Sequence, residues 1–586
     1  MLLLKLFSFF HHEGITEKIF AYAAVQRDEE PSSPELPLAS SILDWELLPL
    51  NRAGTWDNLL FREGIQVLLS FSLIKKGQSD GVYAMHPLVH MWGRDRLTLN
   101  ERKKWCLMAY VTLSSSLRKD ECQPYGFQRV LVTHVRANME YSRSGSDQKG
   151  ISYLDDAYAK FGDLLQKQGY TKEAEILQTK VLDTRNRILG VEHPDTIRAM
   201  ARLASTNQDL GKYTEAEKLE IQVLEARNRL LGVEHPDTIH AMANLAVTYA
   251  SLEKYAVAEN LEMQVLDART RIFGVEHPGT IFAMANLAAT YHNLGKYTEA
   301  EKLEIQVLEA RKRIFGMEHP ETIFAVENLA ITYHDLGKYT EAEKLEIQVL
   351  DARNRIFGVE HPYTIRAMGN LAATYHNLRK YTKAEKLKIE VLDVRNRILG
   401  VEHTDTITAM ASLAATFYNL GKYTEAEKLE IQVLDVRKKN CGVEDLQTIT
   451  AMENLAVTYN HLGKYTEAEK LKTEALDARN RIFGMEHPET IIAMENLAAT
   501  CRNLGKHTEG EKLQIQAQEA QGRVFGGDLP KKFKAMSNVE QAQETQVLDA
   551  RSIIPAEETS DSIQTVLNPP AAILPDEMIY HGKKGM

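Results

Sequence analysis

Cysteine is scarce in this chain of 586 residues, with only four, at positions 106, 122, 441 and 501. No two of them form a C-x-x-C pair, so neither a disulfide framework nor a cysteine-based zinc site is expected. Free, scattered cysteines are typical of a reducing compartment, and the sequence therefore predicts a cytoplasmic protein.

Long apolar runs and basic segments are also missing. The apolar start, MLLLKLFSFFHHEG, is shorter than a membrane-spanning helix and is not followed by a small-residue cleavage site. No other segment approaches 18 apolar residues, so no membrane association is expected. The formal net charge is −11 and no basic stripe is present, which argues against a nucleic-acid partner.

The sequence also lacks recognisable nucleotide-binding and catalytic motifs. No G-x-x-x-x-G-K-[ST] loop occurs, and without it nothing cradles the phosphates of a nucleotide. No cluster of Ser, Cys or His suggests a nucleophile. The acidic residues Glu299, Glu301 and Glu304, interleaved with Lys302, predict a solvated, charged helix face. The sequence thus predicts a protein that is not an enzyme and that uses neither cofactor nor nucleotide.

What the chain does contain is a repeat. One position, held by His in seven repeats and by Asp in one, recurs every 42 residues without a slip. Thr and Ile follow it each time, three and four residues later. The series is His193, His235, His277, His319, His361, His403, Asp445 and His487. Stacked layers of helices would hold these histidines about 10 Å apart. Zinc ligands must converge on one ion at about 2.0–2.1 Å, so we predict a packing role at the helix start and no metal site.

Each repeat carries two apolar stripes with helical spacing. Ile239, Met242 and Leu245 mark the first helix, and Ala300 and Val307 mark the second. A Leu-Gly-Lys-Tyr turn separates the two helices, and a glycine closes the pair. Neither helix can bury its stripe alone, so neighbouring pairs must stack. The pattern predicts an all-α solenoid.

The placement of Leu-Ala, Tyr, Gly-x-Tyr and Val-Leu within each unit resembles a tetratricopeptide repeat. The 42-residue period and the H-P-D-T helix start resemble the kinesin-light-chain subtype. The resemblance covers residues 152 to about 525 and implies a right-handed superhelix of nine helix pairs. The organisation we expect is therefore an array over 151–525, a truncated degenerate repeat over 526–551, and a Pro-rich disordered tail over 552–586.

Residues 1–150 differ in composition and hold all four tryptophans. Within them, residues 61–97 read as helix, strand, strand, helix, which suits a winged-helix-like domain. This segment resembles the one that follows the nucleotide-binding (NB-ARC) module of fungal NLR-like signal-transducing receptors. In that family a Met-His-Asp motif faces the nucleotide, whereas this chain has Met85, His86 and Pro87. Together with the missing phosphate loop, this suggests the carboxyl half of such a receptor.

The repeats differ mainly on one face of the first helix, although their second helices are almost identical. One variable position reads Arg198, His240, Phe282, Phe324, Arg366, Thr408, Thr450 and Ile492. A second reads Gln208, Ala250, His292, His334, His376, Tyr418, Asn460 and Arg502. A uniform scaffold with variable residues on one face is typical of a recognition surface. We therefore assign Phe282, Phe324, His292, His334 and His376 to a peptide-binding groove.

One position on the same face is nearly constant. It holds Asn244, Asn286, Asn328, Asn370, Asn454 and Asn496, with Arg202 and Ser412 as the exceptions. The resemblance implies that these asparagines hold the backbone of a bound peptide, because an amide side chain both donates and accepts hydrogen bonds. The alternative is that each asparagine binds a neighbouring helix.

These observations predict a non-enzymatic scaffold that binds a protein or peptide in its groove, as the sensor half of a fungal NLR-like receptor. A kinesin-light-chain-like cargo adaptor is the alternative. That family carries a coiled coil ahead of its repeats, and residues 1–150 show no sustained heptads. An enzyme that recruits substrate through its repeats would need a catalytic domain, which the sequence does not reveal.

Overall fold

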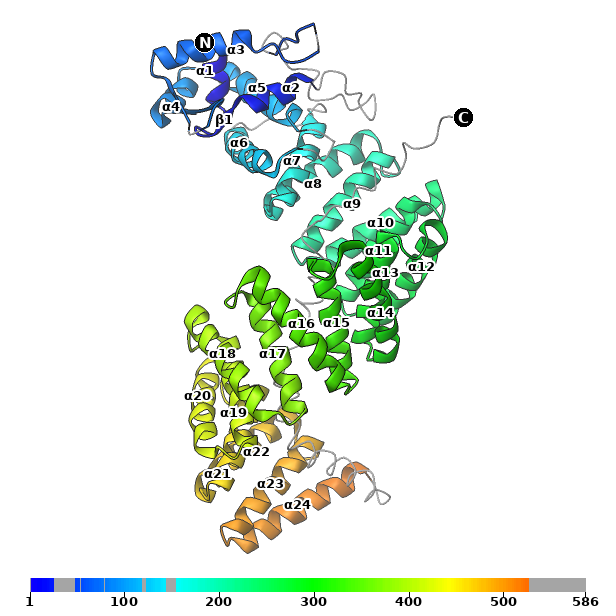
Figure 1. The fold of residues 1–586 in the computed structure, drawn as a ribbon, viewed down its shortest axis with the longest axis vertical. Coiled ribbons are helices and arrows are strands. Elements are labelled where there is room, and N and C mark those ends of the chain that lie inside the picture. Colours follow the sequence, from blue (N-terminus) through cyan, green and yellow to red (C-terminus); the bar gives the residue numbers. More distant parts are fainter. Residues whose placement is uncertain are drawn as a thin grey trace. The chain divides into compact units, whose positions relative to one another are not determined.

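The computed structural model describes residues 2–25, 48–52, 54–77, 79–117, 123–143 and 154–525. The segments expected to form a truncated repeat (526–551) and a tail (552–586) lie outside the described residues. The chain divides into two compact units, one ending at Gly274 and the next beginning at Val275. Figure 1 labels the helices and strands of both. Each unit is described by itself.

The first unit opens with a small mixed region in which a three-stranded antiparallel sheet has the order β1-β3-β2. Its segments are α1 (Leu2–Phe7), β1 (Ile15–Thr16), α2 (Glu17–Val25), α3 (Leu59–Ser70), β2 (Ile74–Lys76), β3 (Val82–Met85), α4 (Pro87–Asp95), α5 (Leu99–Ser115) and α6 (Tyr125–Arg143). The order α3, β2, β3, α4 confirms the predicted helix, strand, strand, helix over residues 61–97.

The hydrophobic core of this region does not stop near residue 150. Phe7, Phe10 and Phe20 are fully buried in a cluster that also contains Phe161 and Leu165. The last two residues belong to α7 (Asp155–Lys167), the first helix of the array. The amino-terminal region therefore shares one core with the first helix pair and caps that end of the array against solvent.

The described residues of the array form nine helix pairs, as predicted. Their first helices are α7, α9 (Pro194–Asp209), α11 (Pro236–Ser251), α13 (Pro278–Asn293), α15 (Pro320–Asp335), α17 (Pro362–Asn377), α19 (Thr404–Asn419), α21 (Leu446–His461) and α23 (Pro488–Asn503). Their second helices are α8 (Thr171–Ile188), α10 (Tyr213–Leu231), α12 (Tyr255–Phe273), α14 (Tyr297–Phe315), α16 (Tyr339–Phe357), α18 (Tyr381–Leu399), α20 (Tyr423–Cys441), α22 (Tyr465–Phe483) and α24 (His507–Phe525).

A histidine caps the first helix of most repeats. In α15, His319 Nδ1 accepts a hydrogen bond from the backbone N–H of Glu321 at 3.2 Å, and its ring stacks on Phe315 at 4.5 Å. The proline that follows occupies the first turn, where a missing N–H costs nothing. Asp445 caps α21 in the same way through the Thr448 N–H at 2.9 Å. The repeated histidines therefore serve the helix start, as predicted.

Replacing His319 with alanine should lower the free energy of unfolding by about 0.5–2 kcal/mol, because the capping acceptor is lost. His319→Asp is the matched variant, since Asp445 already performs the same task in this array, and it should keep most of the stability. Urea unfolding followed by circular dichroism measures both. Equal losses in the two variants would show that the histidine acts through its ring stacking and not through the cap.

Two ladders of ion pairs join successive repeats on the surface, each linking residues 37 positions apart. In one ladder Lys338 Nζ lies 2.7 Å from Glu301 Oε1, and in the other Arg355 Nη1 lies 2.6 Å from Glu318 Oε1. Because these pairs are partly or fully exposed, solvent screening leaves each with little effect on stability. The first ladder links the start of a second helix to the preceding second helix, and the second ladder links the end of a second helix to the loop before its own first helix.

Candidate functional site

The asparagine series lies on one face of the successive first helices. Asn244, Asn328, Asn370, Asn454 and Asn496 are partly exposed, whereas Asn286 is 4% exposed. Among the described residues, the side chains of Asn328 and Asn370 make no hydrogen bond to a neighbouring helix. Their amides are therefore available to a ligand. Phe282 and Phe324 are partly exposed and lie one turn before Asn286 and Asn328 on the same face.

The predicted groove histidines are engaged between repeats. His292 Nε2 lies 2.8 Å from Asp335 Oδ2, and the Asn377 side-chain amide lies 2.8 Å from His334 Nε2. His376 is 4% exposed, with its Nδ1 3.3 Å from Thr416 Oγ1. These contacts tie each first helix to the next one and leave little of each ring for a ligand. The sequence did not reveal these partners, which lie 40 to 43 residues away.

The same contacts control the charge of Asp335. Burial opposes the ionisation of this carboxyl group, but the hydrogen bonds from His292 and His334 outweigh burial and lower its pKa to about 2. Asp335 therefore stays ionised and holds both imidazoles in place. The variable position is thus partly a structural link, and its amino acid affects how adjacent repeats are joined.

The expectation that Glu304 lies on a solvated face is wrong. Glu299 is exposed, but Glu304 is 7% exposed, and Thr332 Oγ1 of the next first helix donates a hydrogen bond to its Oε1 at 3.0 Å. Glu304 lies four residues after the buried Ala300 and three before the buried Val307, so it is in phase with the apolar stripe. That phase was the available signal in the sequence.

Buried polar side chains recur at this second-helix position through the array. The series is Gln178, Glu220, Glu262, Glu304, Glu346, Lys388, Glu430 and Lys472, all no more than 8% exposed. Burial raises the pKa of Glu220, Glu304, Glu346 and Glu430 to about 7, against a smaller opposing effect of a threonine hydroxyl on each. Within the described residues, one carboxylate oxygen (Oε2) of each of these four has no hydrogen-bond partner.

An arginine lies two turns further along each second helix except the last. In six of these repeats the guanidinium donates to a backbone carbonyl at the start of the next first helix, as Arg437 Nη1 does to Gln447 O at 2.9 Å. In some repeats a first-helix glutamate adds a charged partner. Glu453 Oε1 lies 2.8 Å from Arg479 Nε, and Glu327 pairs with the buried Arg353. The position of these glutamates is taken by Ala411 in the repeat of Arg437.

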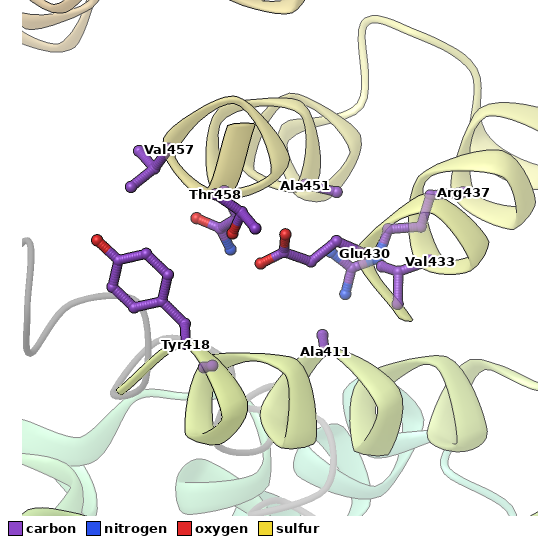
Figure 2. A pocket seen from close by; sticks show the side chains of 10 residues that line it. Ala411, Tyr418, Glu430, Val433, Arg437, Ala451, Val457 and Thr458 are labelled. Atoms are coloured by element: carbon purple, nitrogen blue, oxygen red, sulfur yellow. The ribbon is translucent and has the colours of Figure 1, made fainter. Parts of the chain in front are cut away.

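A small cavity lies between α19, α20 and α21. Figure 2 shows the Glu430 side chain pointing into it, with Tyr418 on one side and Val433 and Ala451 on the other. The remaining lining residues are Ala411, Ala415, Arg437, Asn454, Val457 and Thr458. A second, smaller cavity lies at the equivalent place two repeats earlier, beside Glu327, Glu346 and Asn370. Each cavity is lined by one asparagine of the series and by a buried glutamate of the second helix.

Such an array of stacked helix pairs defines an α-solenoid built from one repeated unit. The model of the tetratricopeptide repeat family matches residues 153–228, 200–271, 263–313, 279–355, 321–386, 363–439 and 447–507. The chain belongs to the tetratricopeptide repeat family. No curated protein matches it.

Two solved structures illustrate the likeness. A putative kinesin light chain with nearly identical TPR-like repeats from Podosopora anserina is 27% identical, with a TM-score of 0.33, over 36% of this chain and 99% of that one. A Signal Transduction ATPase with Numerous Domains protein with a tetratricopeptide repeat sensor from Pyrococcus horikoshii is 16% identical. Its TM-score is 0.50, over 82% of this chain and 63% of that one, which shows a shared fold.

None of the helices in the described part of the chain is long and apolar enough to span a bilayer. The described residues bring together no three His, Cys, Asp or Glu side chains placed to hold a metal ion.

Proposed function

We propose that the protein is a non-enzymatic scaffold that binds an extended peptide segment of a partner protein along the first-helix face of its repeats. The observation that carries the proposal is the asparagine series. Asn328 and Asn370 are partly exposed on successive first helices and make no side-chain bond to a neighbouring helix within the described structure. A peptide backbone offers alternating donors and acceptors, which a row of amide side chains can satisfy.

The aromatic residues on the same face support this proposal. Phe324 lies one turn before Asn328 and keeps part of its ring exposed. An exposed aromatic ring contributes apolar contact area at low entropic cost, and a neighbouring amide fixes the orientation of the ligand. The asparagines would bind the backbone of a peptide whatever its sequence, and the variable residues beside them would select its side chains. Repeats of one architecture would then recognise different peptide segments.

The biological setting we propose is the sensor half of an NLR-like signal-transducing receptor. The helix, strand, strand, helix segment from α3 to α4 precedes the array, and the fold likeness to an archaeal signal-transduction ATPase with a repeat sensor extends over most of the chain. His86 caps α4 through the Leu88 N–H at 3.2 Å, so this histidine has a structural task that needs no nucleotide. A kinesin-light-chain-like cargo adaptor is the second candidate, favoured by the 42-residue repeat.

A random dodecapeptide phage library tests the proposal on the full chain. Peptides that bind wild type should lose more than about a hundredfold in affinity when Asn328 and Asn370 are both replaced by alanine. Each lost contact leaves a desolvated peptide group unpaired, which costs about 1–3 kcal/mol. Fluorescence anisotropy with a selected, labelled peptide measures the loss. A library that yields no binding peptide would contradict the proposal.

The thermal stability of the double variant provides the control. Asn328 and Asn370 are partly exposed and alanine is a better helix former, so the melting temperature should change little. Leu329→Ala removes a side chain that is only 3% exposed and should cost about 2–5 kcal/mol of stability. If the asparagine variant loses as much stability as Leu329→Ala, then the asparagines are structural and the groove does not bind through them.

A further inference from the structure

Ala411, a small first-helix residue, lines the cavity over α20. The corresponding residue two repeats earlier is Glu327, which lines the smaller cavity. Glu327 is 4% exposed and pairs with Arg353 and Arg366, so its carboxylate neutralises the arginine. The alanine side chain occupies less of this space than the glutamate does.

Glu430 is the polar group inside this cavity. It is 8% exposed, its Oε2 has no hydrogen-bond partner in the described part of the chain, and its side chain points into the open space (Figure 2). The charged group that most affects it is Glu427, which carries the same sign. A buried carboxylate oxygen without a partner is costly, and a cation placed against it recovers that cost.

Two other repeats of the array carry a cation at this position. Lys388 and Lys472 occupy the position of Glu430 in two other repeats and are 6% and 8% exposed. Their ammonium groups donate to the backbone oxygens of Ser412 and Asn496 at 3.1 and 3.2 Å. Both acceptors belong to the position of the asparagine series, which Asn454 holds above Glu430. The same carbonyl position is therefore next to a carboxylate in one repeat and to an ammonium in others.

The walls of the cavity suit the stem of a long basic side chain. Val433, Ala451 and Val457 provide apolar surface, along which the methylenes of lysine or arginine can lie. The ring of Tyr418 borders the same space, with its hydroxyl 2.7 Å from His461 Nε2, and an aromatic ring attracts a cation. Arg437 lies two turns from Glu430, about 10 Å along the helix, and its Nη1 is bound to Gln447 O.

We propose that this cavity is a subsite for a lysine or arginine side chain of the bound peptide, with Glu430 as the acceptor of its charge. The inference rests on the proposed function, since the basic residue belongs to a peptide held along the asparagine series. Ala411 makes the subsite accessible, Tyr418 and the aliphatic walls hold the stem, and Asn454 lies beside the carboxylate at the same cavity.

Two variants that copy other repeats of the same chain test the subsite. Glu430→Lys reproduces the repeats of Lys388 and Lys472, and Ala411→Glu reproduces the repeat in which Glu327 pairs with Arg353 beside a smaller cavity. Both should fold, which the melting temperature by circular dichroism checks. The random dodecapeptide phage library is selected against wild type and against each variant. Wild type should enrich peptides that carry Lys or Arg at a common position, and both variants should lose this enrichment.

Affinities of one selected peptide complete the test. The Glu430→Lys variant should bind the selected peptide at least about tenfold more weakly than wild type does. A peptide whose basic residue is replaced by leucine should bind wild type more weakly by a similar factor. The same replacement should not change the affinity for the Glu430→Lys variant. This non-additivity identifies the pair. Peptides that bind and depend on Asn328 and Asn370, yet show no basic preference or no dependence on Glu430, would overturn the subsite alone. A library without any binding peptide would overturn the groove and the subsite together.

Discussion

Replacing Glu304 and Glu346 together with glutamine is expected to stabilise the repeat array by several kcal/mol at pH 8 and by much less at pH 5. Burial raises the pKa of both carboxyl groups to about 7, whereas the ordinary value is 4.5. The folded state therefore holds a proton on each group between pH 4.5 and 7 that the unfolded state has released. Stability is greatest below pH 4.5 and is lost as the pH rises through 7.

The size of this effect follows from the two pKa values. A difference of about 2.5 between folded and unfolded states corresponds to about 3 kcal/mol for each carboxyl group. Glutamine fills the same space without a charge, and Gln178 already occupies the equivalent buried position in α8. Thermal unfolding followed by circular dichroism at both pH values measures the gain.

The comparison of variant with wild type at each pH isolates these two groups from the rest of the chain. His90 and His134 have the opposite effect, because burial lowers the pKa of each to about 4, so they reduce stability as the pH falls below 6.5. A double variant whose gain is the same at pH 5 and pH 8 would show that the carboxyl groups are not held protonated in the folded array.

Arg185→Met is expected to cost about 3–5 kcal/mol of stability, because it leaves a buried carboxylate without its partner. Arg185 Nη2 lies 2.7 Å from Asp155 Oδ2, and the residues are 7% and 3% exposed. Burial raises the pKa of Asp155, and Arg185 is the main influence that opposes the rise. Removal of the guanidinium should therefore destabilise the first helix pair and the core that it shares with the amino-terminal region.

Lys338→Met is the matched comparison for this prediction. It also removes one cation from an ion pair between helices, but Lys338 and Glu301 are partly exposed, with 43% and 18% of their side chains accessible. Solvent screening leaves such a pair with little effect on stability. Urea unfolding of both variants measures the contrast. If Arg185→Met costs no more than Lys338→Met, the buried pair contributes no more than a surface pair.

The periodic parts of this fold could be predicted from the sequence. Nine helix pairs, their 42-residue period and the capping histidines follow from local signals, because helical stripes, turns and caps depend on residues within a few positions of one another. The helix, strand, strand, helix order of residues 61–97 followed from the same kind of local pattern. The same local signal, a capping histidine followed by proline, begins α4 at His86 and Pro87 and begins α15 at His319.

The character of the candidate site was decided by the tertiary structure. Glu304 is charged and its sequence neighbours are exposed, but the next first helix covers it and supplies Thr332, 28 residues away. His334 varies like a free surface residue, yet Asn377, 43 residues away, binds its ring. The cavity at Glu430 is lined on one side by Asn454, Val457 and Thr458 of the next first helix, α21. These properties depend on what the adjacent repeat places against each side chain, and a 42-residue pattern alone carries no information about that contact.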